Sequence, residues 1–448
     1  MVTKKDKPNS RKGGLVNSAS SPVEELLMAA LERGDDSAQT GRYLITYKNG
    51  SGEAALKSLQ TTQGMRVADA RDFDGQAITL ESAGDADAVF LPEIGVALVG
   101  SNAAQERGMG IQSDTATNSL IESIDPEYFT FTDYSNQNFA ERTQGSTNEF
   151  LRGFQRAAQM ISQNWQPGAS NQQVETEEDA QVVGATWGLI ACKVPPSVRS
   201  GMGIKVAVLD TGFDLGHPDF VGRPVVSATF VGQPVQDLNG HGTHMIGTAC
   251  GPKAPAGTIP RYGIGFRSSI FVAKILSNSG SSVGGSVLAG MNWAIANRCP
   301  VILAAVGGPG GPQPAYTAAG QAALTNGCLI IAAAGSSGSS VGAPANSPTI
   351  MSVGAVGKTL QPTPFSPIGK IELVGPGVDI LSSYPRPRLY QTWSGSASAT
   401  AHIAGCAALW AETSPDLRGQ KLWRKLLATA KPLPFPRTRV GAGLVQAP

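Results

Sequence analysis

Three short motifs contain the residues of this chain whose types suit acid–base and nucleophilic chemistry. The apolar run IKVAVLD ends on Asp210, NGHGTHMIGTACG contains His241 and His244, and SGSASATAHIAG contains His402. The fourth histidine, His217, follows Asp210 in TGFDLGHPDF, so all the histidines of the chain lie in or beside these motifs. A histidine oriented by a carboxylate is a common base for activating a nucleophile. The motifs therefore predict a catalytic site rather than four unrelated packing residues.

The elements that must position these residues alternate between apolar strands and helices over 186–448. The strands are near-continuous hydrophobic runs, as expected for strands buried on both faces of a sheet. A carboxylate at the carboxyl end of such a strand, as expected for Asp210, lies where open α/β sheets place their active sites, although alone it also fits a structural cap. We predict an α/β domain with a doubly wound, mostly parallel sheet. Its expected strands are 204–210, 269–276, 300–308 and 328–335, and its expected helices are 242–251, 286–298 and 315–327.

A second, smaller unit is expected over residues 41–135. Its strands and helices alternate in the order β-α-β-β-α-β, which is typical of a ferredoxin-like α+β module. Residues 1–40 are polar and are expected to form a flexible tail, in which 23–33 are compatible with a short helix. Residues 136–185 are expected to be a linker with one helix. The expected strands of the module are 42–48, 65–73, 88–100 and 119–131, and its helices are 52–64 and 101–109.

The composition excludes several classes of partner. The 448 residues carry a formal net charge of +1 and only 15% are charged, so no basic face for nucleic acid is expected. No stretch approaches the roughly 20 apolar residues of a membrane span, and no signal peptide is recognised, so a cytoplasmic location is expected, with non-classical secretion left open. The oligomeric state is not determined.

The five cysteines lie mostly in apolar runs and are expected to be reduced core thiols: Cys192, Cys250, Cys299, Cys328 and Cys406.

Taken together, VAVLDTGFDLGHPDF, NGHGTHMIGTACG and SGSASATAHIAG resemble the three signature blocks of the subtilisin-like serine peptidases, or subtilases, in the order Asp, His, Ser. The resemblance covers about 186–448, and 41–135 more weakly resembles the propeptide inhibitor of these enzymes. It implies a serine endopeptidase that forms an acyl-enzyme on polypeptide substrates. Asp210 would orient and charge-stabilise His241, and His241 would be the general base. The other three histidines match structural positions of the family.

The resemblance places the nucleophile five residues before His402, where this chain has Ala397. The neighbouring Ser396 and Ser398 are not expected to replace it, because one step along a helix turns a side chain by about 100°. The chain as written is therefore expected to be inactive. We favour an engineered Ser→Ala change, since the Asp210 and His241 motifs and the propeptide-like module are retained. The alternative is a natural pseudoprotease that binds peptides or its own propeptide without cleaving them.

The resemblance also implies an oxyanion hole and a substrate-binding segment. Ser336 occupies the position of the family's oxyanion-hole asparagine, and Ala397 would supply the second donor from its backbone. An exposed strand edge would pair with an extended peptide, beside a pocket with room for a large apolar P1 side chain. These substrate-binding residues are Ala304, Ala305, Val306, Gly307, Gly308, Ala332, Ala333, Ala334 and Gly342.

Two further expectations concern metal and the N-terminal half. The resemblance matches Asp219 to a calcium ligand of the family, but the loop 251–266 does not resemble the ligand-bearing loop. No cofactor is therefore expected, with calcium at Asp219 left open as the alternative. The module over 41–135 is expected to dock on the peptidase domain as an intramolecular inhibitor, with the segment that follows it running through the substrate cleft. With serine in place of Ala397, self-cleavage is then expected between about 131 and 186, where the backbone is polar and exposed.

Overall fold

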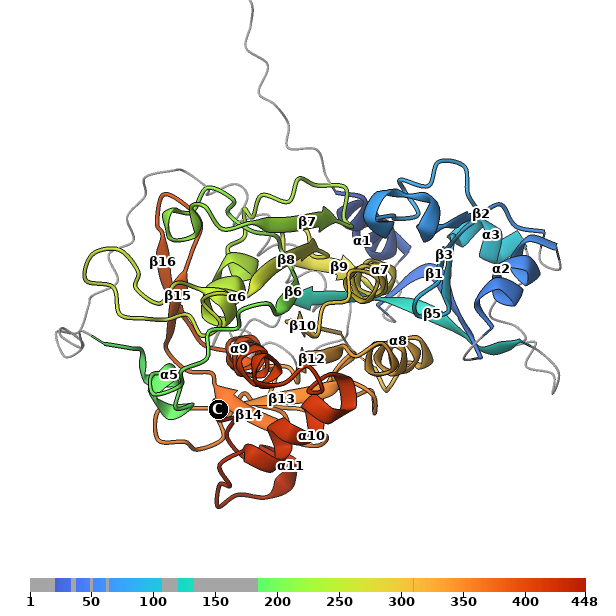
Figure 1. Ribbon diagram of the computed structural model, residues 1–448. Coiled ribbons are helices and arrows are strands. Elements are labelled where there is room, and N and C mark those ends of the chain that lie inside the picture. Colours follow the sequence, from blue (N-terminus) through green and yellow to red (C-terminus); the bar gives the residue numbers. More distant parts are fainter. Residues whose placement is uncertain are drawn as a thin grey trace, which may run out of the picture.

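A computed structural model shows two β-sheets that lie on opposite sides of a pair of helices (Figure 1). The structure describes residues 21–33, 38–48, 51–61, 64–106, 120–132, 184–308 and 310–448. The linker expected over 136–185 lies outside these ranges except at its last two residues. None of the described helices combines the length and the apolar character that crossing a bilayer would need.

The larger sheet has seven strands, and all its neighbouring strands run parallel. This arrangement confirms the predicted doubly wound, mostly parallel α/β fold, and β6 ends on Asp210 as expected. In spatial order the strands are β14 (Leu373–Pro376), β13 (Met351–Val356), β12 (Leu329–Ala333), β10 (Val301–Ala304), β6 (Lys205–Asp210), β8 (Ser269–Lys274) and β7 (Val225–Thr229).

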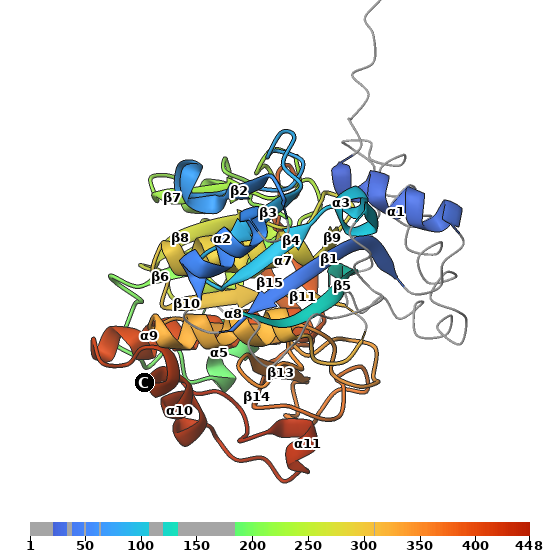
Figure 2. The same ribbon diagram turned by 90° about the vertical axis from the view of Figure 1, so that its right-hand side faces the viewer.

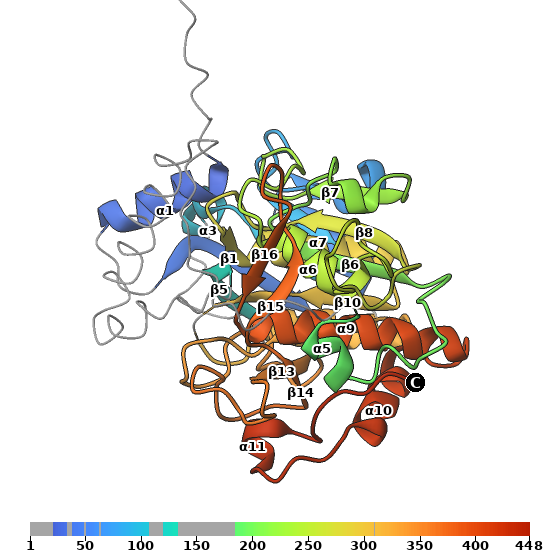
Figure 3. The ribbon, with the colours of Figure 1, turned by 90° about the vertical axis from the view of Figure 1, so that its left-hand side faces the viewer.

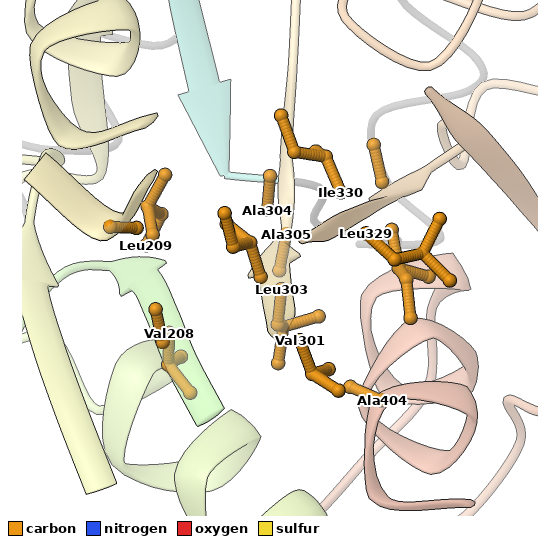
Figure 4. Close-up of a cluster of buried hydrophobic side chains, with 14 of the residues drawn as sticks. Val208, Leu209, Val301, Leu303, Ala304, Ala305, Leu329, Ile330 and Ala404 are labelled. Carbon is orange, nitrogen blue, oxygen red and sulfur yellow. The ribbon is translucent and has the colours of Figure 1, made fainter. Parts of the chain in front are cut away.

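Helices cover both faces of this sheet. Helices α6 (His241–Cys250) and α9 (Ser396–Thr413) pack against each other on one face, and α7 (Gly284–Ala296) and α8 (Pro314–Thr325) pack on the other (Figures 1 and 3). Figure 4 shows the core between the central strands and α9, where Val208, Leu303 and Ala404 are among the buried side chains. Helix α9 is built almost entirely from small and apolar residues, so it lies close to the sheet. The remaining helices of this domain are α5 (Trp187–Ala191), α10 (Gly419–Thr429) and α11 (Arg437–Val440), and β15 (Ile380–Ser383) pairs with β16 (Tyr390–Trp393).

The smaller sheet lies outside α7 and α8 (Figure 2). Alternate residues of its strands face opposite sides. Ile45, Phe90 and Val99 pack under helices α2 (Gly52–Thr61) and α3 (Ser101–Glu106), whereas Leu44 and Leu98 join the core of the larger domain. The docked face is therefore covered by the peptidase-like domain itself. Its strands, in spatial order, are β5 (Ile121–Thr132), β1 (Gln39–Tyr47), β4 (Val96–Val99), β3 (Ala88–Leu91) and β2 (Val67–Asp69).

Two features of the N-terminal half differ from the sequence prediction. Residues 88–100, predicted as one strand, form the hairpin β3–β4, because the chain turns at 92–95 and Gly95 adopts a φ of 63° that favours glycine. The tail over 1–40 contains the short helix that its sequence allowed, but its described residues are packed rather than flexible. Within it, Pro22–Arg33 form helix α1, whose residues Val23 and Leu27 are buried, and β1 already begins at Gln39.

All five cysteines are buried and free, as predicted. Burial raises the pKa of the thiols of Cys250, Cys299 and Cys328 to about 12. A thiol with so high a pKa is almost entirely protonated near neutral pH and is a poor nucleophile. The cysteines are therefore core residues and not candidate nucleophiles.

Candidate active site

The carboxyl end of β6 and the start of α6 bring a carboxylate and an imidazole together. Asp210 is the last residue of β6 and His241 is the first residue of α6. Nδ1 of His241 lies 2.8 Å from Oδ1 and 2.9 Å from Oδ2 of Asp210, and both side chains are almost fully buried. This contact leaves Nε2 as the ring nitrogen that can exchange a proton with a reacting group. The two residues that the first two motifs predicted are thus directly paired.

A buried carboxylate that the sequence analysis missed holds the loop around His241. Asp237 accepts hydrogen bonds from the backbone N–H groups of Asn239, Gly240 and Thr243 at 2.8–3.0 Å. It also accepts the hydroxyls of Thr211, at 2.9 Å, and Thr243, at 2.8 Å. These bonds fix the first turn of α6 to the end of β6. The sequence signal was an aspartate four residues before a histidine in the loop DLNGHGT, where carboxylates commonly bond backbone N–H groups.

Close packing explains why glycine follows His241. A Cβ atom on Gly242 would lie 2.2 Å from the carbonyl oxygen of Gly212, which real Cβ atoms do not do. The N–H of Gly242 donates to the Thr211 hydroxyl at 2.9 Å. The glycine therefore lets α6 approach the loop after β6 closely enough for His241 to reach Asp210.

The other three histidines bond to backbone carbonyl oxygens. Nε2 of His244 lies 2.9 Å from the oxygen of Ile380, and Nδ1 of His402 lies 2.9 Å from the oxygen of Ser398. His217 likewise contacts a carbonyl oxygen, through Nε2 at 2.9 Å. Burial lowers the pKa of His244 to about 3 and that of His402 to about 4, so both rings are neutral near pH 7. Their roles are structural, as the resemblance implied.

An aromatic side chain that the sequence analysis did not single out lies against both histidines of α6. The Trp393 indole stacks on His244, with ring centroids 5.0 Å apart and planes 24° apart. Its centroid lies 5.6 Å from that of His241, with the rings tilted by 32°. Trp393 closes β16, more than a hundred residues after the histidines, so no local pattern connects it to them.

The third motif forms the start of α9, and Ala397 is the second residue of that helix. The helix N-terminus carries a partial positive charge from the aligned peptide dipoles, which favours an anion nearby. Ser396 is already committed to structural bonds, because its hydroxyl accepts the N–H of Gly335 at 3.1 Å. Its own N–H donates to the hydroxyl oxygen of Ser336 at 3.0 Å. The structure thus places Ser336 beside the first turn of α9, and Ser396 and Ser398 are both buried.

The end of β5 lies between two strands of the larger domain. On one side it pairs antiparallel with β11 (Val306–Gly307), with Thr132 opposite Val306 and Phe131 opposite Gly307. On the other side it pairs antiparallel with β9 (Ser281–Val283), with Thr130 opposite Ser282. The Thr132 N–H also donates to the oxygen of Gly280 at 2.9 Å. The strand edge over 304–308, predicted to bind an extended peptide, is therefore paired with the chain's own N-terminal half.

The described part of β5 ends next to the loop that carries His241. A Cβ atom placed on Gly280 would lie 2.9 Å from Oγ1 of Thr132 and 3.4 Å from Nδ2 of Asn239. Asn239 is two residues before His241 in the sequence. Thr132, the last described residue of β5, therefore lies close to the loop that precedes His241.

Comparison with known proteins agrees with this geometry. Residues 201–443 match the subtilase family. The chain belongs to that family. Subtilisin DY from Bacillus licheniformis is 35% identical over 248 residues, which cover 54% of this chain and 88% of that protein. An alkaline protease from Alkalihalobacillus alcalophilus is 35% identical over 282 residues, covering 60% of this chain and 72% of that protein.

A solved structure gives the same result for the fold. The crystal structure of a cold adapted subtilisin-like serine proteinase superimposes with a TM-score of 0.53 at 29% identity, covering 59% of this chain and 99% of that one. The subtilisin-like fold and the membership of a serine peptidase family are therefore established. The matched family region begins at residue 201, so the N-terminal half must be interpreted from its own contacts.

The substrate-binding residues predicted for this subtilase lie in adjacent segments. Ala304 ends β10 and Ala305 precedes β11, while Ala332 and Ala333 lie in β12, which pairs with β10. Gly308 donates its N–H to Ala343 at 2.8 Å, and Gly342 donates to Ala334 at 3.2 Å. The structure therefore gathers the predicted residues around the end of β10. Ala332–Ala334 are nearly fully buried. Any contact with a substrate side chain is therefore expected at the partly exposed residues Gly307, Gly308 and Gly342.

The surroundings of Asp219 do not fit a calcium site in this subtilase. Its Oδ2 accepts hydrogen bonds from the hydroxyls of Tyr262 and, at 3.1 Å, Tyr390. Calcium is bound by several carboxylate, carbonyl and water oxygens. Over the described ranges, no three His, Cys, Asp or Glu side chains gather in a way that could hold a metal ion. The two tyrosines give the Asp219 carboxylate a structural role.

Proposed function

We propose that this chain is the precursor form of a subtilisin-like serine endopeptidase. Its N-terminal module acts as an intramolecular inhibitor, and the chain is inactive as written because Ala397 stands at the nucleophile position. The observation that carries the proposal is the pairing of β5 with both β9 and β11, beside the loop of His241. An extended segment held by two flanking strands is how a peptide is bound by β-addition.

The contacts of the module with the larger domain support an inhibitor that is docked in a defined position. Oε1 of Glu127 in β5 accepts the N–H of Gly285 in the first turn of α7 at 2.6 Å, and its Oε2 accepts the hydroxyl of Thr40 at 2.6 Å. Asn292 of α7 accepts the N–H of Glu93 at 2.9 Å and donates to Gln76 at 2.8 Å. These polar contacts hold the module in a defined position against the domain that carries the site.

With serine at position 397, the residues present would support acyl transfer. His241 would take the hydroxyl proton through Nε2, and Asp210 would hold the ring and stabilise the imidazolium. The Ala397 backbone N–H and the Ser336 hydroxyl would donate to the oxyanion of the tetrahedral intermediate. The Ser336 hydroxyl already accepts a bond from Ser396, so its own proton remains available for this donation. The substrate would be a polypeptide that replaces β5 between β9 and β11.

The origin of Ala397 separates two versions of the proposal. The paired Asp210 and His241 and the supporting carboxylate of Asp237 favour an engineered Ser→Ala change that keeps the precursor full length. The alternative is a natural pseudoprotease that binds extended peptides or its own module. Serine in place of asparagine at Ser336 favours this alternative, because a serine hydroxyl reaches less far than an asparagine amide.

Labelling with a fluorophosphonate probe tests the proposal. Ala397→Ser should create covalent labelling, a further His241→Ala change should abolish it, and Ser396→Ala in the Ala397→Ser background should leave labelling in place. Labelling is measured both with the module attached and after β5 has been released by self-cleavage or added protease. A folded Ala397→Ser protein that is not labelled in either state would contradict the enzyme and support the pseudoprotease.

A further inference from the structure

Helix α1 lies outside the module yet contacts the strand that occupies the proposed substrate position. Its residues Val23, Leu27 and Ala30 recur at helical spacing and form one buried stripe. The stripe packs in a single hydrophobic cluster with Phe129 and Phe131 of β5. The same cluster includes Ala38, Val231 and Val283. Helix α1 therefore joins the N-terminal half to the peptidase domain through the side chains of β5.

The two phenylalanines belong to the part of β5 that pairs with the peptidase domain. Phe129 lies opposite Val283 in β9, and Phe131 lies opposite Ser281 in β9 and Gly307 in β11. Being two residues apart on a strand, their side chains project from the same face. Phe129 is fully buried and Phe131 is 6% exposed. Because α1 lies beside β1 and β9 on the outside of the molecule, it covers this face (Figures 2 and 3).

The start of α1 is fixed in place by its own capping interactions and by the peptidase domain. Ser21 and Glu24 form a capping box, in which the N–H of Ser21 donates to Glu24 at 3.0 Å and the N–H of Glu24 donates to the Ser21 hydroxyl at 3.3 Å. Pro22 packs on Gly232, where an added Cβ would lie 3.0 Å from the proline ring.

The first turn of α1 also acts electrostatically on the neighbourhood of the active site. Lys274 is fully buried at the end of β8, and Nζ donates to the carbonyl oxygen of Thr211. Burial lowers the pKa of Lys274 to about 8, while the charges of Asp237, Asp210 and Glu24 act in the opposite direction. Glu24 of α1 is thus close enough to contribute to the charge balance beside the catalytic pair.

We propose that α1 is a second inhibitory element, a clamp that holds β5 between β9 and β11 and must leave before a polypeptide substrate can enter. The inhibitory role of α1 rests on the proposed function, in which β5 occupies the substrate position. The physical reason is cooperative: removing β5 would expose the apolar stripe of α1, and removing α1 would expose Phe129 and Phe131. Release of β5 and release of α1 are therefore coupled events.

Hydrogen exchange of the full Ala397 chain tests the clamp without requiring catalysis. Leu27→Asp places a charge in the cluster, and Met28→Asp, at a neighbouring α1 position that is 43% exposed, is the matched control. Leu27→Asp should accelerate exchange of the amides of 129–132 by about tenfold or more, because opening of β5 becomes easier. Met28→Asp should leave their exchange unchanged. Amides of β10 and β12 report whether the peptidase domain remains folded, and Leu27→Ala replaces Leu27→Asp if it does not.

Two outcomes would overturn the inference. If α1 exchanges faster in Leu27→Asp while 129–132 keep their protection, α1 does not hold β5. If 129–132 exchange faster but Leu27→Asp does not speed fluorophosphonate labelling of the Ala397→Ser protein, the clamp has no inhibitory effect. Absence of labelling in every Ala397→Ser protein would instead contradict the proposed function, and the exchange result would still decide whether α1 holds β5.

Discussion

The two sides of the candidate active site differ in how completely they are built. On the α6 side, Asp210 is paired with His241 and the loop is held by five hydrogen bonds to Asp237. On the α9 side, Ala397 presents a methyl group and joins the hydrophobic core, and the position of the family's asparagine holds Ser336. The carboxylate–imidazole pair is therefore held firmly in place, whereas position 397, the proposed nucleophile position, carries no hydroxyl.

This difference follows from what each side chain does for the fold. Removing a carboxylate such as Asp237 would leave several buried N–H and O–H groups without an acceptor, which is strongly destabilising. Replacing a serine hydroxyl by a methyl group at position 397 leaves a residue that packs well in an apolar helix. Position 397 can thus carry a methyl group in place of a hydroxyl without disturbing the positioning of His241.

The largest expected effect comes from a substitution on the α6 side, in the Asp210–His241 pair. In the Ala397→Ser protein, Asp210→Asn should lower kcat by about 10⁴, because the imidazole would lose its orientation and the stabilisation of its charged form. Steady-state kinetics on a peptide substrate measures the change. Asp219→Asn is the control, because the Asp219 carboxylate hydrogen-bonds to two tyrosine hydroxyls and not to His241. It should change kcat little. Equal kcat values for Asp210→Asn and its parent would mean that the pair does not act in catalysis.

A second change tests whether the α6 side depends on Asp237. Asp237→Ala should lower the free energy of unfolding by about 3 kcal/mol or more, because five donors lose a charged, buried acceptor. Chemical denaturation of the Ala397 chain measures this directly. A loss below about 0.5 kcal/mol, typical of surface positions, would show that the loop is held by other contacts.

On the α9 side, substitutions of Ser336 in the Ala397→Ser background test whether its hydroxyl stabilises the oxyanion. Ser336→Ala should lower kcat by about tenfold or more with little change in KM, the pattern of a bond made only in the transition state. Ser336→Asn should raise kcat, because the longer amide reaches further toward the oxyanion. An unchanged kcat in Ser336→Ala would assign oxyanion stabilisation to backbone N–H groups alone.

A further comparison concerns the buried histidines on the two sides, His244 in α6 and His402 in α9. Their pKa values are lowered by burial to about 3 and about 4, from an ordinary value of 6.5. The unfolded chain therefore binds more protons below pH 6.5, and stability should fall as the pH drops. The expected slope is about 1.4 kcal/mol per pH unit for each ring. Denaturation curves at pH 7, 6 and 5 measure it, and a flat stability over that range would contradict the buried neutral rings.

The sequence was informative where local pattern and position in the fold coincide. Near-continuous apolar runs defined the parallel strands, and their ends located Asp210, while a glycine-rich turn into a helix located His241. Ala397 was singled out by the resemblance to the subtilases. The strand edge at 304–308 was also predicted, as part of what the resemblance to the subtilases implies. Each of these inferences depends on residues that are close together in the chain.

Features that arise from long-range contacts could not be obtained in this way. Trp393 lies against His241 although more than a hundred residues separate them in sequence. A short helix over 23–33 was compatible with the sequence, but nothing in those residues shows that it covers Phe129 and Phe131. The sequence analysis predicted that the segment after the module runs through the substrate cleft, and that segment lies outside the described residues. The structure pairs the edge at 306–307 with the last residues of β5, which the sequence analysis did not foresee.

Mass spectrometry of the Ala397→Ser protein tests the central claim most directly. If β5 is the inhibitory segment of a self-processing precursor, the restored enzyme should cut the chain after Thr132, in the linker that runs to about residue 186, and the Ala397→Ser, His241→Ala double variant should remain full length. The mature N-terminus is then read from the intact mass and from N-terminal sequencing. A new N-terminus within 41–130, or a folded Ala397→Ser protein that stays uncut, would contradict the account.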